Sequence, residues 1–111
     1  MAVYSDISVD QGADFSAEVV VDDSDGTLAN LTGYTVAGQI RKTYSSSTKV
    51  EFTCTITGAS TGEITIGLSN TQTNAMKAGR YVYDVEITKT STGYKTRVIE
   101  GQVTVNAGVT Q

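Results

Sequence analysis

The chain has 111 residues and a formal charge of −4, and 18% of its residues are charged. This length is typical of one domain with one hydrophobic core, which buries about two-thirds of the unfolded surface. Lys and Arg are dispersed through a mildly acidic chain, whereas a nucleic-acid surface needs a basic patch, and no apolar run approaches the ~20 residues of a membrane span. We therefore expect one soluble domain that binds neither nucleic acid nor membrane.

Alternation of apolar and polar residues is the main signal along the chain, because successive residues of a strand face opposite sides of a sheet. In the segment 15–21, for example, Phe15, Ala17 and Val19 alternate with polar residues. Further strands are predicted on the same ground, with a short first strand near the N-terminus. The predicted strands cover residues 3–9, 15–21, 34–41, 51–57, 64–68, 81–87 and 102–105.

The predicted strands are separated by turn signals. Residues 22–26, 60–62 and 91–93 each end in Gly and suit tight turns, and residues 43–48 read as a polar loop. Strands at intervals of about 8–12 residues with turns between them indicate an all-β sandwich or barrel. The composition agrees, because Thr, Val and Tyr favour strands.

One segment lacks the alternation and predicts a short helix around residues 70–78. Ser69 is a good N-cap, Gln72 completes a capping box, and Gly79 suits a helix stop. We expect this helix to cross from one sheet to the other, with Leu68 and Met76 packed beneath it.

Several residues have predicted structural roles. Gly33 is expected at a positive φ in the bend that enters the strand at Tyr34. Tyr81 and Tyr83 are expected to point inward, with hydroxyls bonded at the edge of the core. Arg41 or Arg80 is expected to pair with Asp84 or Glu86 on the outer face.

The sequence offers little for catalysis. It contains no His, the commonest general base, and its single cysteine, Cys54, falls on the apolar side of its strand and forms no intrachain disulfide. Asp84 and Glu86 share one side of a strand, where exposed carboxylates usually keep a surface soluble. We expect no enzymatic activity and no cofactor.

One acidic cluster is a candidate metal site. Asp22, Asp23 and Asp25 precede Gly26, and calcium prefers clustered oxygen ligands on a loop. The spacing departs from an EF-hand loop, which would place its first ligand at Val21 and its last at Thr32. A solvated hairpin turn is the alternative interpretation, and it is the one we favour.

Two tyrosines in predicted turns are candidate interaction residues. Tyr44 lies in the polar loop 43–48, and Tyr94 follows the turn at residues 91–93. Aromatic side chains exposed on loops are typical of surfaces that recognise glycans or proteins. Packing at the edge of the sandwich is the alternative for both.

A series of segments, taken in order, resembles a known family. Its most specific pieces are Leu31-Thr32-Gly33-Tyr34 and the segment from Gly79 to Val85. The remaining pieces are Asp6 to Gly12, Asp14-Phe15, Gln39 to Lys42, Thr61 to Ile64, Leu68-Ser69, Gln72-Thr73 and Glu100 to Val105. Together they resemble the immunoglobulin-like N-terminal domain of the upper baseplate proteins of tailed bacteriophages. In that family the domain heads a longer chain, whereas this sequence stops at Gln111.

The resemblance implies an immunoglobulin-like β-sandwich of about seven strands over residues 1–106, followed by a short tail over residues 107–111. It also implies a structural protein of the phage particle, made in the bacterial cytoplasm because no signal peptide is visible. Expected partners are other virion proteins and further copies of the chain in a symmetric array. The place in the particle stays open between an adaptor of the tail, baseplate or neck and a decoration protein of the head. Recognition of a host glycan or surface protein is the remaining alternative.

Overall fold

The computed structural model describes residues 3–21 and 30–109. Within these ranges the chain forms nine strands, one α-helix and one turn of 3-10 helix. In chain order they are β1 (Val3–Tyr4), β2 (Ile7–Asp10), β3 (Phe15–Val20), β4 (Tyr34–Arg41), β5 (Lys49–Glu51), β6 (Thr53–Gly58), the 3-10 turn (Ala59–Thr61), β7 (Glu63–Leu68), α1 (Asn70–Ala75), β8 (Gly79–Lys89) and β9 (Lys95–Asn106). No helix in the part of the chain that the structure describes is long and apolar enough to cross a membrane.

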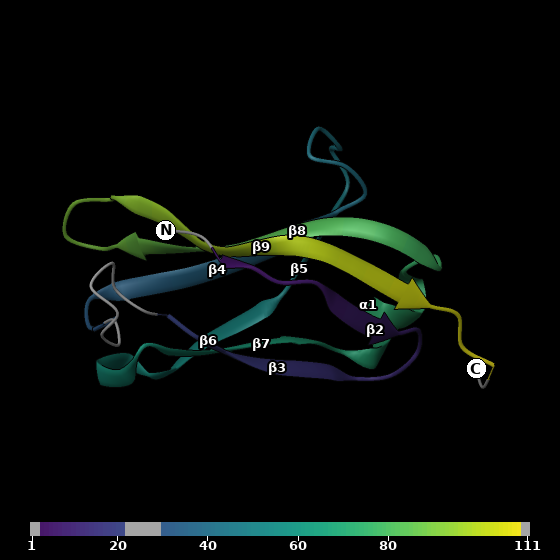
Figure 1. Ribbon diagram of the computed structural model, residues 1–111, viewed down its shortest axis with the longest axis horizontal. Coiled ribbons are helices and arrows are strands. Elements are labelled where there is room, and N and C mark those ends of the chain that lie inside the picture. Colours follow the sequence, from purple (N-terminus) through teal and green to yellow (C-terminus); the bar gives the residue numbers. More distant parts are fainter. Residues whose placement is uncertain (1–2, 22–29, 110–111) are drawn as a thin grey trace.

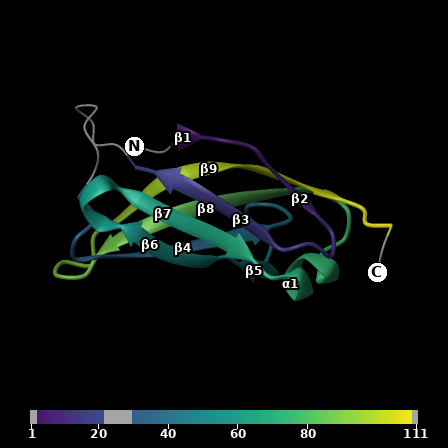
Figure 2. The same cartoon turned by 90° about the horizontal axis from the view of Figure 1, so that it is seen from below.

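The strands form two sheets that pack face to face (Figures 1 and 2). The larger sheet has the order β1-β9-β8-β4-β5, with β2 also paired to β9, and the smaller sheet has the order β3-β7-β6. Three strands in the order β3-β7-β6 facing β9-β8-β4 give the arrangement of an immunoglobulin sandwich. The predicted all-β, immunoglobulin-like β-sandwich is therefore confirmed.

The core lies between the two sheets, on the inward side of each alternating strand. Ile64, Ile66, Val85 and Val103 are almost completely buried there. Phe52 packs edge-on against Tyr83, with ring centroids 5.9 Å apart at 78°, an arrangement that aromatic pairs favour. The alternation read from the sequence thus separates the core from the solvent correctly along most strands.

The N-terminal strand is divided into two parts. Both β1 and β2 run parallel to β9, with Val3 opposite Ile99 and Val9 opposite Val105. Between them the chain is held by Ser5, whose N–H donates to the carbonyl of Glu100 at 2.8 Å, and by Asp6, whose carboxylate accepts from the N–H of Gln102 at 3.0 Å. The single strand predicted over 3–9 is therefore two short strands on one edge.

The strand predicted over 51–57 is also two strands, and they belong to different sheets. β5 pairs with β4 in the larger sheet, while β6 pairs with β7 in the smaller one. Phe52 lies between them, buried, with its N–H donating to the carbonyl of Gly38 at 3.0 Å. A continuous alternation in sequence thus crosses from one sheet to the other. Together with the division of the N-terminal strand, it accounts for nine described strands where about seven are predicted.

The last strand is longer than predicted. β9 begins at Lys95 because it pairs with β8 along both lengths, from Thr88 opposite Lys95 to Gly79 opposite Val105. A β-bulge breaks the register between Val85 and Glu86, and it places Val98 and Ile99 in the core one after the other. Two adjacent buried residues interrupt the alternation of apolar and polar residues, so the part of β9 before residue 102 does not show the pattern by which strands are predicted.

The helix begins as predicted and ends earlier. Ser69 is its N-cap, and the capping box with Gln72 is complete in both directions. Met76 already has an extended backbone and is buried, so α1 stops at Ala75 rather than near residue 78. Gly79 is consequently not the helix stop but the first residue of β8, with a φ of 143°. As expected, α1 connects the smaller sheet to the larger one, and Leu68 and Met76 are both buried.

Candidate interaction surface

The outward side of the larger sheet carries a ladder of polar side chains, which we call the outer face. Strand pairing sets Gln39 of β4 opposite Asp84 of β8, and Asp84 opposite Glu100 of β9. One step along, Glu86 is opposite Arg97. Directly opposite side chains on neighbouring strands lie about 5 Å apart, close enough to interact.

Arg97 joins two carboxylates of the outer face. Its Nε lies 3.2 Å from Oδ2 of Asp84, and its Nη1 lies 3.5 Å from Oε1 of Glu100. The Arg97 side chain is 47% exposed, so each ion pair is worth no more than about 1 kcal/mol. These pairs contribute little to stability and mainly fix the position of the guanidinium group.

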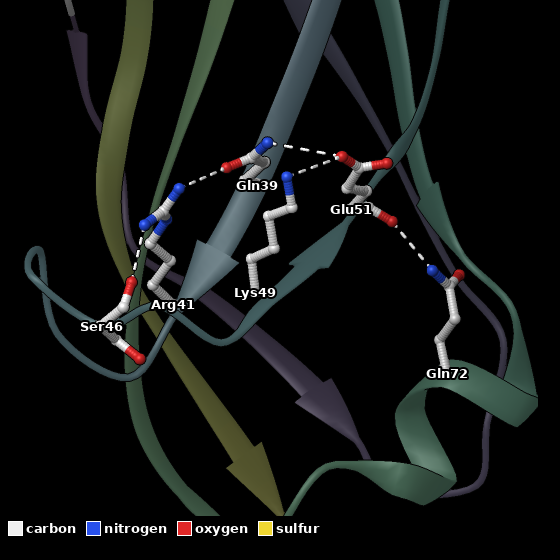
Figure 3. A network of polar contacts seen from close by, with 6 residues as sticks. All are labelled: Gln39, Arg41, Ser46, Lys49, Glu51 and Gln72. Atoms are coloured by element: carbon white, nitrogen blue, oxygen red, sulfur yellow. Dashed lines mark hydrogen bonds and ion pairs between the residues drawn. The ribbon is translucent and has the colours of Figure 1, made fainter.

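A second set of contacts crosses β4 and β5 (Figure 3). Arg41 donates to the Ser46 carbonyl at 2.6 Å and to Oε1 of Gln39 at 3.1 Å. Gln39 donates in turn to Oε1 of Glu51 at 3.4 Å, and the Lys49 ammonium lies 3.5 Å from the same oxygen. Most polar side chains at this end of the outer face are therefore held on two sides.

The network also reaches the helix. Gln72, which completes the capping box of α1, donates through Nε2 to the backbone carbonyl of Glu51 at 2.8 Å. Figure 3 shows Gln72 reaching up from α1 toward β5. The helix α1, which connects the two sheets, is thereby bonded to β5, the edge strand that borders the outer face.

A pocket of about 300 Å³ opens on the outer face beside the β4–β5 loop. Its walls combine both charge signs with one exposed aromatic ring, that of Tyr44, which is 67% exposed. In Figure 1 the β4–β5 loop rises clear of the larger sheet. The residues that line the pocket are Gln39, Arg41, Tyr44, Val82, Tyr83, Asp84, Glu86 and Arg97.

The two tyrosines predicted as interaction residues lie in different places. Tyr44 lines the pocket, whereas Tyr94 lies in the β8–β9 turn and is 70% exposed. Figures 1 and 2 place that turn at one end of the molecule, away from the β4–β5 loop. The structure therefore does not bring them together.

The candidate metal ligands Asp22, Asp23 and Asp25 lie outside the described residues. Within residues 3–21 and 30–109 there is no group of three His, Cys, Asp or Glu side chains that could hold a metal ion. Asp84 and Glu86 share the outer face as predicted, but the cation beside Asp84 is Arg97 rather than Arg41 or Arg80.

The Cys54 thiol is half-buried against the core, and burial raises its pKa above the ordinary value of 9.0. Its Sγ lies 3.8 Å from the Phe52 carbonyl, to which it donates. A protonated thiol in this setting is a poor nucleophile. Cys54 is best described as a small core residue.

Other predicted roles agree with the structure. Gly33 has a φ of 82° in the bend before β4. The Tyr81 hydroxyl donates to the Lys77 carbonyl at 2.7 Å, and the Tyr83 hydroxyl donates to the Ser5 carbonyl. Each ring therefore packs inward while its hydroxyl is bonded at the border of the core.

Comparison with known proteins places the chain in a fold class. A family model described as "LtfC-like, beta-sandwich domain" matches residues 2–106. No curated protein matches the chain. Among solved structures, InlP of Listeria monocytogenes is 17% identical with a TM-score of 0.49, and the match covers 95% of this chain and 28% of InlP. A family 123 glycoside hydrolase from Clostridium perfringens is 13% identical with a TM-score of 0.47, over 97% of this chain and 23% of the hydrolase. The chain thus spans about a quarter of the length of each of these two proteins.

Proposed function

The chain belongs to the family of LtfC-like, beta-sandwich domains, and we propose that it is a non-enzymatic structural module of a bacteriophage particle. In this role it is an adaptor of the tail, baseplate or neck that holds neighbouring virion proteins together. The sequence resemblance to the immunoglobulin-like domain of upper baseplate proteins supports the phage setting. The sandwich fold is compatible with that resemblance.

The observation that carries the proposal is the prearranged outer face. Arg97, Arg41 and Gln39 are each held by two partners, so a bound protein would immobilise few free side chains. Ordering a free side chain on binding costs about 0.5–1.5 kcal/mol. Because these side chains are already ordered in the folded protein, binding loses less of this free energy. Tyr and Arg are also the residues that most often anchor protein interfaces. Tyr44 beside Arg41 and Arg97 gives this pocket such anchors.

The arrangement of charges suits protein recognition more than acid–base chemistry. Asp84 is paired with Arg97, and Glu86 lies opposite the same cation in the strand register. Interspersed charges of both signs set the register of a partner with the opposite pattern. The proposal accordingly assigns the two carboxylates to binding.

Two alternatives use the same surface. A decoration protein of the head would contact capsid subunits rather than tail proteins. A recognition module would bind a host glycan or surface protein, and one observation favours the glycan. Tyr44 lines the same pocket as Gln39 and Asp84, whose polar groups are held by neighbouring side chains, and small-molecule sites commonly combine aromatic side chains with a few placed polar groups.

Purified phage particles provide the test. We expect mass spectrometry to find the chain in them, and electron microscopy to place several copies at symmetry-related positions in the tail, baseplate or neck. Copies on the head would favour decoration. Absence of the chain from purified particles would overturn the virion role, and binding to a glycan array together with that absence would favour recognition.

A further inference from the structure

Among residues 3–21 and 30–109, the strand β3 forms one border of the smaller sheet and is paired on one side only, to β7. Its odd-numbered residues carry the hydrogen bonds to β7, because Val21 continues this ladder with its N–H donating to the Gly62 carbonyl at 2.8 Å. In an antiparallel pair the intervening residues point their N–H and C=O groups the other way. The backbone groups of Ser16, Glu18 and Val20 therefore face outward, and none has a hydrogen-bond partner among the described residues.

A cleft of about 300 Å³ runs beside this free edge, between β3 and the strands β1 and β2 of the other sheet. Figure 2 shows β3 along the border of its sheet, with β1 and β2 next to it in the other layer. In many immunoglobulin sandwiches a first strand pairs with the equivalent of β3, whereas here both N-terminal strands pair with β9. No strand in the described part of the chain consequently occupies the position beside β3.

Exposed apolar side chains gather at the same border. Val3 is 62% exposed on β1, and Val20 is 49% exposed on β3. Val3 and Val20 both line the cleft. Apolar side chains that surround a free strand edge are a common feature of edges that pair with another strand.

The other borders of the two sheets are protected from pairing. β5 has three residues, and β6 has an irregular register between Ile56 and Gly58. The border made by β1 and β2 is interrupted between Tyr4 and Ile7. Short edges, bulges and interruptions are the devices by which proteins avoid strand addition. β3 has a regular register from Phe15 to Val20 and lacks them.

We propose that the free edge of β3 binds the β3 strand of a second copy of this chain, in an antiparallel pair about a two-fold axis. The smaller sheets of the two copies then form one continuous sheet. The inference rests on the proposed function, since it names the surface through which the assembly module associates with itself.

Charge and the length of overlap along β3 together favour one register for this pair. When Ala17 lies on the two-fold axis, Glu18 is opposite Ser16 of the second copy, and Phe15 is opposite Val19 of the second copy. The outward N–H and C=O groups of Ser16 and Glu18 are then all paired. A shift by one step would place the two Glu18 side chains directly opposite each other, which is unfavourable. An aromatic residue opposite a β-branched one is favourable.

Cysteine cross-linking tests the register. The experiment uses the full chain with Cys54→Ala, so that the introduced thiol is the only one. Residues on the axis form a non-hydrogen-bonded pair with Cα atoms about 4.5 Å apart, within the range that a disulfide spans. We expect Ala17→Cys to form a disulfide-linked dimer under mild oxidation. Val19→Cys is the matched control, because its two copies would be about 13 Å apart along the pair and should stay unlinked.

Charge substitutions at an exposed position provide a second test that does not depend on oxidation. Ser16→Lys places a cation opposite Glu18 of the second copy, and Ser16→Glu places a carboxylate there. Each change occurs twice in a dimer, so the dissociation constants of these two variants should differ by about tenfold, with the Lys variant tighter. Thr35→Lys and Thr35→Glu, on the exposed side of β4, make the same changes in net charge and should differ far less.

Sedimentation of the wild-type chain decides the proposal. A dimer that cross-links at position 17 but not at 19, with the expected order of the Ser16 variants, supports it. A chain that stays monomeric up to about 1 mM overturns the pairing with a second copy and leaves the edge to a strand from another protein. Equal cross-linking at both positions, or equal affinities of the Ser16 variants, also overturns it. A chain found in phage particles but monomeric in solution would contradict the pairing alone, whereas a β3 dimer that is absent from particles would contradict the proposed function alone.

Discussion

The Tyr83 hydroxyl donates a hydrogen bond to the backbone carbonyl of Ser5, at the point where the chain passes from β1 to β2. The contact joins residues 78 positions apart and holds the N-terminal strands against the core. Ser5 is also close to Gly101 of β9, where there is no room for a side chain. The position of β1 and β2 thus depends on the Tyr83 hydroxyl and on the absence of a side chain at Gly101.

Gly101→Ala should displace residues 3–10 from β9. A Cβ at position 101 would collide with the Ser5 carbonyl group, and the Tyr83 ring lies 3.2 Å away, so neither side can yield easily. We expect a loss of about 1–3 kcal/mol in the free energy of unfolding, with faster hydrogen exchange in β1 and β2. Gln102→Ala, on the other side of the same strand, should cost less than about 0.5 kcal/mol. Unchanged exchange in β1 in the Gly101 variant would contradict the close packing of Ser5 on Gly101.

Stability should fall as the pH rises above about 9. Burial raises the pKa of the Tyr83 hydroxyl above its ordinary value of 10.0, and it raises the pKa of the Cys54 thiol above 9.0. Both groups keep their protons in the folded chain at pH values where the unfolded chain has lost them. The folded state therefore binds more protons, and the free energy of unfolding decreases with increasing pH.

Urea denaturation between pH 7 and 10.5 measures this dependence. Cys54→Ala should remove the part of the decline that begins near pH 9, and Tyr83→Phe should reduce the part that begins near pH 10. Tyr83→Phe also leaves the Ser5 carbonyl without its partner, so its stability at pH 7 should be lower by about 1 kcal/mol. A steeper decline in either variant would contradict the assignment.

Thr73→Val should destabilise the connection between α1 and the β2–β3 turn. The Thr73 hydroxyl is completely buried; it accepts from the N–H of Gly12 at 3.1 Å and donates to the carbonyl of Ala13 at 2.8 Å. Valine has nearly the same shape but leaves both backbone groups without this partner, at a cost of about 1–3 kcal/mol. Thr73→Ser keeps the hydroxyl and loses one methyl group, which costs about 1 kcal/mol. Thermal unfolding of both variants checks the order, and a larger loss for serine would show that the methyl group matters more.

The sequence predicts the fold well because alternation and turn residues act locally. The strands 34–41 and 15–20 appear almost as predicted, and the capping box from Ser69 to Gln72 forms as expected. The change of sheet at Phe52 is not predictable in the same way. The apolar residues before and after Phe52 keep a period of two. The pattern therefore cannot indicate that the pairing partner changes from β4 to β7 at this point.

The outer face is predicted only in part for a similar reason. Tyr44, Asp84 and Glu86 are visible as exposed candidates, but Arg97 is not. Ile99 and Val103 face inward, so strict alternation would turn Arg97 inward as well. The β-bulge at Val98 shifts the register by one residue and turns Arg97 to the outer face beside Asp84.

Tyr44→Ala should reduce incorporation of the chain into phage particles, and Tyr94→Ala should not. Both side chains are largely exposed, so neither change should alter the free energy of unfolding by more than about 0.5 kcal/mol. Tyr44 differs because it lines the same pocket as Arg41 and Arg97, where a partner would bury its ring, and truncating such an anchor costs about 2 kcal/mol or more. That corresponds to a drop of more than tenfold in affinity.

Quantitative mass spectrometry of particles assembled with each variant measures the copy number, with thermal unfolding as the control for folding. Equal incorporation of the two variants would remove the pocket from the contact surface, and a loss confined to Tyr94→Ala would move that surface to the β8–β9 turn.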